Sequence, residues 1–190
     1  MAGEQCHEHI VLIGFMGSGK STVARRLKKL TGLPIIDVDA RIEQMQGKTI
    51  SAIFDEVGEE GFRQIETATL AGIVNEPRSI VSCGGGVVST PANLPVLADL
   101  GTVVYLQVPL EEAIERISDP STRPMLSGPT PVEDIYAERL PLYEEAADVT
   151  VNTSGKSVGK VAAFVLQAVQ EHDNCLRGNC HAEKGSEALL

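Results

Sequence analysis

The chain has 190 residues, of which 43% are hydrophobic, so it is long enough for one domain with a full core. Aromatic residues make up only 4% and tryptophan is absent, which argues against an aromatic platform for nucleic-acid bases. The net charge of −10 repels polyanions, so an anionic ligand must be held by a few focused cations and amides. No nucleic-acid partner is expected.

The sequence also lacks the signals of membrane insertion and export. No stretch approaches the roughly 18 consecutive apolar residues of a membrane span. The first residues, MAGEQCHEHI, are polar and lack the apolar core of a signal peptide. We therefore expect a cytoplasmic protein with no membrane partner.

Apolar runs alternate with helical patterns along the chain. The predicted elements are, in chain order, a strand at 10–13, a helix beginning near Lys20, a strand at 33–38, helices at 50–57 and 59–74 on either side of Gly58, a strand at 79–83, a helix beginning near Pro91, a strand at 102–108, helices at 110–117 and 132–146, a strand at 149–151 and a helix at 158–170. In the helix after Lys20, the residues Val23, Leu27 and Leu30 form one apolar face.

This alternation predicts an α/β fold with a parallel sheet between two layers of helices. Ligands of such sheets bind beyond the carboxyl ends of the strands, and the polar clusters of this sequence follow predicted strands. Residues 1–170 are expected to form a single domain, and 171–190 a polar tail.

A glycine-rich segment, GFMGSGKS at 14–21, follows the first predicted strand. It matches the phosphate-binding pattern G-x-x-x-x-G-K-[ST], with a strand before it and a helix after it. Glycines let successive amides turn toward an anion, and the helix adds the positive end of its dipole. The match predicts that Lys20 reaches the β- and γ-phosphates and that the Ser21 hydroxyl binds Mg²⁺. The predicted nucleotide-binding residues here are Gly17, Ser18, Gly19, Lys20, Ser21 and Thr22.

A small kinase is the expected class of enzyme. The chain has no N-K-x-D segment of the kind that reads guanine in GTPases, and it is short for a motor or a large ATPase. In a small kinase, a second substrate meets the γ-phosphate of the bound nucleotide.

The chain resembles the shikimate kinases in order and spacing over about residues 10–170. The segments that carry the resemblance are GFMGSGKST at 14–22, DVD at 37–39, FRQIE at 62–66, GGG at 84–86, RPML at 123–126 and RLPLY at 139–143. This family transfers a phosphate from ATP, with Mg²⁺, to the 3-hydroxyl of shikimate in aromatic amino-acid biosynthesis. The resemblance implies a P-loop kinase fold like that of nucleoside monophosphate kinases, with a five-stranded parallel sheet in the order 2-3-1-4-5. It also implies a substrate-binding lobe at about 38–75 and a lid at about 119–131, and we expect a monomer.

Asp37 and Asp39 are the predicted acidic residues of the site. Placed two apart in a strand, their carboxylates would point to the same side. The resemblance implies that Asp37 contacts Mg²⁺ through water. It implies that Asp39 binds the substrate hydroxyls and orients the attacking one, as a base or by position alone. The alternative for Asp39 is an N-cap of the following helix.

Arg63 and Arg139 are the predicted clamp for the substrate carboxylate, because a guanidinium offers paired donors that match it. Glu66 shares a helical face with Arg63 and is expected to hold it in place. The alternative for a lone arginine is an exposed surface residue. The resemblance also implies substrate contacts for the triple glycine, which comprises Gly84, Gly85 and Gly86. The alternative for this segment is a flexible turn between a strand and a helix.

Arg123 lies in the segment 119–131, which is rich in Pro, Gly and Ser and is predicted to be a mobile loop. The resemblance implies a lid that brings the charge of Arg123 to the transferred phosphoryl group. Arg116 matches the position that packs on adenine, and Lys156 falls in the loop on the adenine side. The implied catalytic residues are Lys20, Asp39 and Arg123.

Two other functions are weighed against this one. A related kinase for gluconate or a nucleotide lacks this acidic pair with two arginines. A non-catalytic nucleotide-binding module would lack a base, a metal ligand or the lid arginine, and all are present here. Near the end of the chain, His172, Cys175, Cys180 and His181 match no zinc spacing closely, so a polar tail is weighed against a metal site or an oxidised pair.

Overall fold

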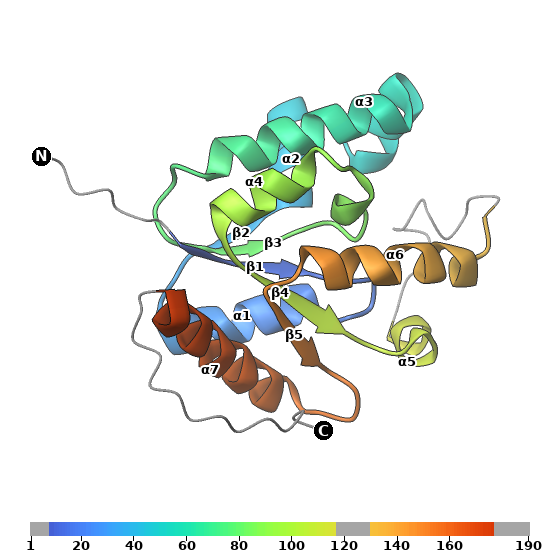
Figure 1. Cartoon of the computed structure of the whole chain (residues 1–190). Coiled ribbons are helices and arrows are strands. Elements are labelled where there is room, and N and C mark those ends of the chain that lie inside the picture. Colours follow the sequence, from blue (N-terminus) through green and yellow to red (C-terminus); the bar gives the residue numbers. More distant parts are fainter. Residues whose placement is uncertain (1–7, 117–129, 177–190) are drawn as a thin grey trace, which may run out of the picture.

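The structure is a computed structural model that describes residues 8–116 and 130–176. Its five strands form one parallel sheet in the order β2-β3-β1-β4-β5, which confirms the expected order (Figure 1). The strands are β1 His9–Ile13, β2 Ile35–Asp37, β3 Ile80–Ser82, β4 Gly101–Gln107 and β5 Val149–Asn152. Arg123 and most of the predicted lid lie outside the described residues.

Helices cover both faces of the sheet, so the fold has three layers (Figure 1). The helices are α1 Lys20–Thr31, α2 Val38–Gln46, α3 Ile50–Ile73, the 3₁₀ turn η1 Val87–Ser89, α4 Asn93–Leu100, α5 Leu110–Glu115, α6 Val132–Ala146 and α7 Val158–Leu176. Helices α1 and α7 pack on one face, and α3, α4 and α6 on the other.

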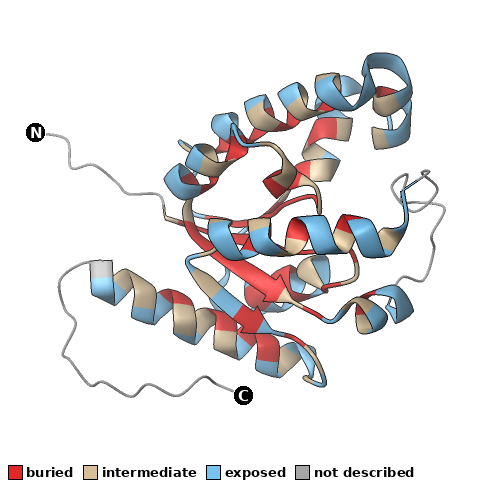
Figure 2. Ribbon diagram, turned by 45° about the vertical axis from the view of Figure 1, so that its right-hand side comes forward, coloured by how far each residue is buried: buried red, intermediate tan, exposed pale blue. Residues whose placement is uncertain are grey.

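Strand β1 is buried along its whole length because it is central and covered on both faces (Figure 2). Ile10 and Leu12 pack in the core with α1 and α7, whereas Val11 and Ile13 pack in the core under α3, α4 and α6. Successive side chains of a strand point to opposite faces, so this one short run joins both cores. It delivers the chain to the phosphate-binding loop.

The segment after β2 differs from the prediction. The strand ends at Asp37, and an unpredicted helix, α2, follows at once. Val38 and Ile42 are fully buried one helical turn apart, which anchors α2 on the core. Asp37 caps this helix, since its Oδ1 accepts a hydrogen bond from the Ala40 amide at 3.1 Å. The strand placement of Asp39 is therefore wrong, and so is the alternative that Asp39 is the cap.

The helices predicted at 50–57 and 59–74 lie on either side of a kink within α3 at Gly58, whose φ of 71° and ψ of −178° are not helical, so the predicted division at Gly58 is confirmed. Two other details differ from the prediction. Leu30, which was assigned to the apolar face of α1, is 49% exposed. Helix α7 continues beyond residue 170, and Asp173 in this extension accepts a hydrogen bond from the Thr102 hydroxyl at 3.0 Å.

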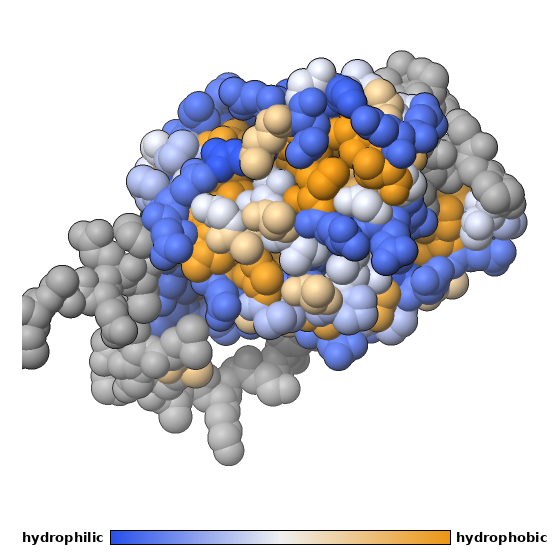
Figure 3. All heavy atoms as spheres, turned by 90° about the horizontal axis from the view of Figure 1, so that it is seen from above, coloured by the Kyte–Doolittle hydropathy of each residue, from blue (hydrophilic) through white to orange (hydrophobic). Residues whose placement is uncertain are grey.

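Within the described ranges, none of the helices is both long enough and apolar enough to cross a membrane. The exposed large hydrophobic residues lie on different helices: Leu30 on α1, Met45 on α2, Val57 on α3, Ile114 on α5 and Val158 on α7. Seen from above, hydrophobic areas of the surface alternate with hydrophilic ones (Figure 3).

Candidate active site

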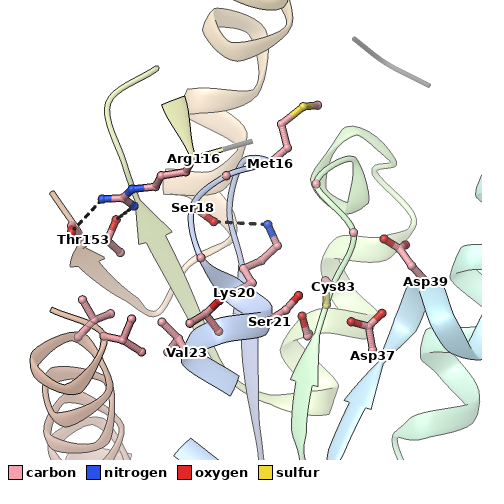
Figure 4. Close-up of a pocket in the computed structure, with 18 of the residues that line it drawn as sticks. Met16, Ser18, Lys20, Ser21, Val23, Asp37, Asp39, Cys83, Arg116 and Thr153 are labelled. Atoms are coloured by element: carbon pink, nitrogen blue, oxygen red, sulfur yellow. Dashed lines mark hydrogen bonds between the residues drawn. The ribbon is translucent and has the colours of Figure 1, made fainter. Parts of the chain in front are cut away.

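A cavity of about 820 Å³ opens at the carboxyl ends of the strands (Figure 4). Most of the residues predicted for the site line it: Gly17, Ser18, Gly19, Lys20, Ser21, Thr22, Asp37, Asp39, Gly84, Gly85, Arg116 and Lys156. Gly86, the last residue of the triple glycine, does not line the cavity, and neither do Arg63 and Arg139, which adjoin this glycine segment.

The phosphate-binding loop packs directly against the backbone of β4 and of α5. A Cβ atom at Gly17, where φ is +79°, would lie 2.2 Å from the carbonyl oxygen of Ala113. A Cβ at Gly14 would lie 2.7 Å from the carbonyl oxygen of Leu106. The glycines are therefore required by packing as well as by the turn of the amides.

Lys20, the first residue of α1, reaches back across its own loop. Its Nζ donates hydrogen bonds to the carbonyl oxygens of Gly14 at 2.6 Å and Phe15 at 2.9 Å, and lies 3.4 Å from Ser18 Oγ (Figure 4). The loop thus holds the ammonium group beside the cavity at the amino end of a helix, where an anion is stabilised.

Both acidic residues reach the cavity, but from different elements (Figure 4). Asp37 is the last residue of β2, and Asp39 lies in the first turn of α2. The carboxylate of Asp39 faces the triple glycine, since a Cβ at Gly84 would lie 2.7 Å from its Oδ1. A carboxylate therefore stands across the cavity from the phosphate-binding loop.

The triple glycine makes room for charged side chains. A Cβ at Gly86 would lie 2.4 Å from Nη2 of Arg63, just as one at Gly84 would crowd Asp39. A Cβ at Gly85 would meet nothing closer than 3.5 Å. Side chains at the outer two positions would displace the residues predicted to bind the acceptor, so the segment is more than a flexible turn.

Arg63 on α3 is held by carboxylates of its own helix. Its Nη1 donates to Glu66 Oε2 at 2.9 Å and its Nη2 to Glu59 Oε1 at 3.3 Å, which confirms the expected partnership with Glu66. Its Nε is buried and has no hydrogen-bond partner among the described residues. Burial raises the pKa of Glu66, and the Arg63 guanidinium opposes this rise. Among the described residues, this arginine of the predicted clamp therefore retains one donor without a partner.

Arg139 on α6 is only 4% exposed, although it carries a charge. Its Nη1 lies 3.4 Å from the carbonyl oxygen of Gly85, and it forms no ion pair with a carboxylate in the part of the chain that the structure describes. Buried charges are normally paired, so this guanidinium is suited to an anionic ligand.

The opposite end of the cavity is bounded by the end of α5 and the loop after β5. Arg116 donates to Thr153 Oγ1 at 3.1 Å (Figure 4). It also donates to Glu112 Oε2 at 2.6 Å. The same loop carries Lys156, whose amide bonds to the Thr153 carbonyl oxygen at 3.3 Å. These contacts fix the guanidinium plane at the mouth of the cavity.

Sequence reasoning missed several residues of this region. Cys83 and Thr153 line the cavity, and each follows the end of a strand, which is a signal that could have found them. Burial raises the pKa of the Cys83 thiol far above its usual value, so this group stays protonated. Tyr143 and Asn93, described below, have no such signal because their roles depend on tertiary contacts.

The residues near the end of the chain form no metal site within the described ranges. Nε2 of His172 lies 3.8 Å from Asp148 Oδ1, and Cys175 is exposed with a free thiol. Cys180 and His181 lie outside the described residues.

Comparisons with known proteins identify the family. A sequence model of the family described as "Shikimate kinase" matches residues 16–170. A shikimate kinase of Halorhodospira halophila is 42% identical over 173 residues, covering 90% of this chain and 98% of that protein. One from Dehalococcoides mccartyi is 38% identical over 87% of this chain and 96% of its own length.

Solved structures agree with the sequence matches. The shikimate kinase of Acinetobacter baumannii, in complex with shikimate, superposes with a TM-score of 0.81 at 35% identity, over 86% of this chain and 93% of that one. The shikimate kinase of Aquifex aeolicus superposes with a TM-score of 0.76 at 32% identity, over 87% of this chain and 98% of that one. A gluconokinase from Sinorhizobium meliloti, with a TM-score of 0.57 and 16% identity over 94% of this chain, shares the fold alone. The chain belongs to the shikimate kinase family, whose members are ATP-dependent phosphotransferases.

Proposed function

We propose that this chain transfers the γ-phosphoryl group of ATP to the 3-hydroxyl of shikimate, giving shikimate 3-phosphate and ADP. The observation that carries the proposal is that one cavity joins the phosphate-binding loop to Asp39 and to the triple glycine. The buried guanidinium of Arg139 adjoins that glycine segment and has no carboxylate partner among the described residues. This arrangement suits an acceptor that carries both hydroxyl groups and one carboxylate.

The nucleotide would lie over the loop, with its phosphates against the loop amides and the amino end of α1. Lys20 would exchange its contacts with the carbonyl oxygens of Gly14 and Phe15 for the β- and γ-phosphates. Arg116 and Lys156, at the far end of the cavity, are the proposed contacts for the base and its surroundings.

Ser21 and Asp37 are the proposed residues for Mg²⁺. Both line the cavity and supply oxygen donors, which fit an ion that takes one or two protein ligands together with phosphates and water. Asp37 gives one oxygen to the Ala40 amide, which orients its carboxylate and leaves the second oxygen for a bound water. When bound, the ion neutralises charge on the phosphates.

The acceptor would lie between Asp39 and the arginines. Arg63 and Arg139 would bind its carboxylate, and the amides of Gly84, Gly85 and Gly86 would approach its ring. Asp39 would accept a hydrogen bond from the attacking hydroxyl and aim its oxygen at the γ-phosphorus. The oxygen–phosphorus bond forms as the bond to the leaving ADP oxygen breaks, and the proton of the hydroxyl passes to the Asp39 carboxylate or, where Asp39 acts by position alone, to water. Arg123, outside the described residues, is proposed on the family resemblance to stabilise the transferred group.

A coupled assay of ADP release tests the proposal. The purified chain is given MgATP with shikimate, with gluconate, with a nucleoside monophosphate, or with no acceptor. We expect ADP release that depends on shikimate, and its loss in Lys20→Ala while the circular dichroism spectrum is retained. Release that depends equally on another acceptor, or not at all on shikimate, would refute the proposal.

A further inference from the structure

The carbonyl oxygen of Gly85 accepts hydrogen bonds from side chains of α6. The Tyr143 hydroxyl donates to it through a short bond, and Nη1 of Arg139 lies at the longer distance of 3.4 Å. The two donors are four residues apart in the helix and therefore lie on the same face. The middle residue of the triple glycine is thus tied to the helix that carries half of the proposed clamp.

The ring of Tyr143 is fixed by packing that does not involve the glycine segment. It is fully buried and stacks on Tyr105 of β4, with ring centroids 5.1 Å apart and planes at 15°. Burial raises the pKa of the Tyr143 phenol, so the hydroxyl stays protonated and remains a donor. The oxygen of Gly85 therefore meets a donor whose position is set by the core.

The two donors have different consequences for the site. Gly85 is half-buried beside the cavity, and its carbonyl oxygen is stabilised by a hydrogen-bond donor from the protein. Because the Tyr143 hydroxyl supplies one donor, the oxygen keeps a partner when Nη1 of Arg139 leaves it to bind a carboxylate. The peptide is planar and trans, so holding the Gly85 oxygen also fixes the direction of the Gly86 amide.

We propose that Tyr143 is a positioning residue for the acceptor substrate. Its hydroxyl holds the Gly85 carbonyl, which keeps the glycine segment in place and leaves Arg139 free to bind a carboxylate. Without that hydroxyl, Arg139 is the remaining side-chain donor to the Gly85 oxygen among the described residues, so it moves closer to this oxygen and binds the acceptor less well. The inference rests on the proposed function for the identity of the acceptor, but the contact itself is independent of it.

The chain offers a matched control for the test. Tyr143→Phe removes the hydroxyl and keeps the stacked ring. Tyr105→Phe removes the hydroxyl of the other ring in the stack, which is buried and has no hydrogen-bond partner within the described residues. We expect Tyr143→Phe to raise the KM for shikimate about tenfold, the effect of losing one hydrogen bond to a charged ligand, with the KM for ATP unchanged. Tyr105→Phe should change neither KM.

A merely structural role would lower the melting temperature without separating the two KM values. An unchanged KM for shikimate in Tyr143→Phe, or equal rises for both substrates, would overturn the proposal. A double variant gives a further test. If Tyr143 acts through Arg139, adding Tyr143→Phe to Arg139→Lys raises the KM for shikimate much less than it does in the wild-type chain, whereas additive effects contradict the proposal.

A crystal structure of Tyr143→Phe without ligands separates this inference from the proposed function. If the wild-type chain releases no ADP with shikimate, the proposed function fails, yet the position of Arg139 can still be compared. We expect its guanidinium to move closer to the Gly85 oxygen than 3.4 Å. An unmoved guanidinium with the glycine segment in its original place would overturn the inference.

Discussion

The side-chain nitrogen of Asn93 donates a hydrogen bond to the carbonyl oxygen of Val87, 2.8 Å away. The bond runs from the first residue of α4 back to the turn after the triple glycine. Asn93 is fully buried, and its Oδ1 accepts a bond of 2.6 Å from the Thr67 hydroxyl of α3. One side chain therefore joins α4, the turn and the helix that carries Arg63.

We expect Asn93→Ala to lower the free energy of unfolding by about 1–3 kcal/mol, because it leaves buried polar groups without partners. Urea denaturation measures the change. Asn152→Ala is the control, since the exposed side chain of Asn152 accepts, from the part of the chain that the structure describes, only a local bond from the Ser154 amide. The free energy of unfolding of Asn152→Ala should stay within about 0.5 kcal/mol of the wild-type value. Equal decreases in the two variants would contradict the prediction.

Gly17→Ala is expected to disrupt the phosphate-binding loop. The new Cβ would lie 2.2 Å from the Ala113 carbonyl oxygen, so backbone must move. Gly19→Ala is the matched control, because Gly19 also has positive φ, +90°, but a Cβ there meets nothing within 4 Å. Gly19→Ala should lower the free energy of unfolding only by the roughly 1–2 kcal/mol that a residue with a Cβ costs in the left-handed backbone conformation. The melting temperature and nucleotide affinity of Gly17→Ala should fall further, and a ranking in reverse order would count against this account.

The stability contribution of Glu66 should depend on pH. Burial raises the pKa of this carboxyl above 4.5, so it binds its proton more tightly in the folded than in the unfolded chain. Its contribution is therefore complete below 4.5 and is lost as the pH rises through the raised value. Relative to Glu66→Gln, the wild-type free energy of unfolding should fall as the pH rises above 4.5.

Denaturation of both proteins across this range measures the difference. Glu59→Gln removes the exposed partner of the same arginine and controls for the loss of an ion pair to Arg63. The prediction is contradicted if the free energy of unfolding of the wild-type chain, relative to that of Glu66→Gln, grows as the pH rises.

Arg139→Lys should keep the buried charge but lose the paired donors of the guanidinium. We expect the KM for shikimate to rise by the equivalent of about 1.5–3 kcal/mol, and the KM for ATP to change far less. Steady-state kinetics with each substrate varied in turn measures both. Arg41→Lys, which alters an arginine paired with Glu76 on the surface of the molecule, is the control. Equal changes in both KM values would assign Arg139 a structural role.

The layers of the fold and the phosphate-binding loop were predictable because their signals are local. Apolar runs such as 10–13 and 102–108 are typical of buried parallel strands, and the glycine pattern after the first run specifies both a turn and a ligand. Glu66 was also predictable as the partner of Arg63, since three residues along a helix bring side chains together.

The segment after β2 could not be divided correctly from the same signals. In the run 33–38, LPIIDV, the apolar Val38 follows Asp37, so the sequence looks like one strand that continues past the residue at which the backbone turns. The buried pair Val38 and Ile42 carries the helical spacing, but α2 spans only nine residues, too few for a strong pattern. Asn93 and Tyr143 were missed for another reason. A polar residue at a helix start and a tyrosine within a helix are ordinary, and only contacts with distant segments give them their roles.

The central position of β1 has a consequence for synthesis of the chain. β1 is made first, yet its neighbours in the sheet are β3 and β4, which end at Ser82 and Gln107. As the chain leaves the ribosome, both hydrogen-bonding edges of β1 stay unpaired until β3 and β4 have been made, and such open edges favour aggregation. The phosphate-binding loop completes its packing later still, because Gly17 packs on the carbonyl of Ala113. A nascent chain therefore acquires its nucleotide-binding geometry only after residue 113 has emerged, late in translation.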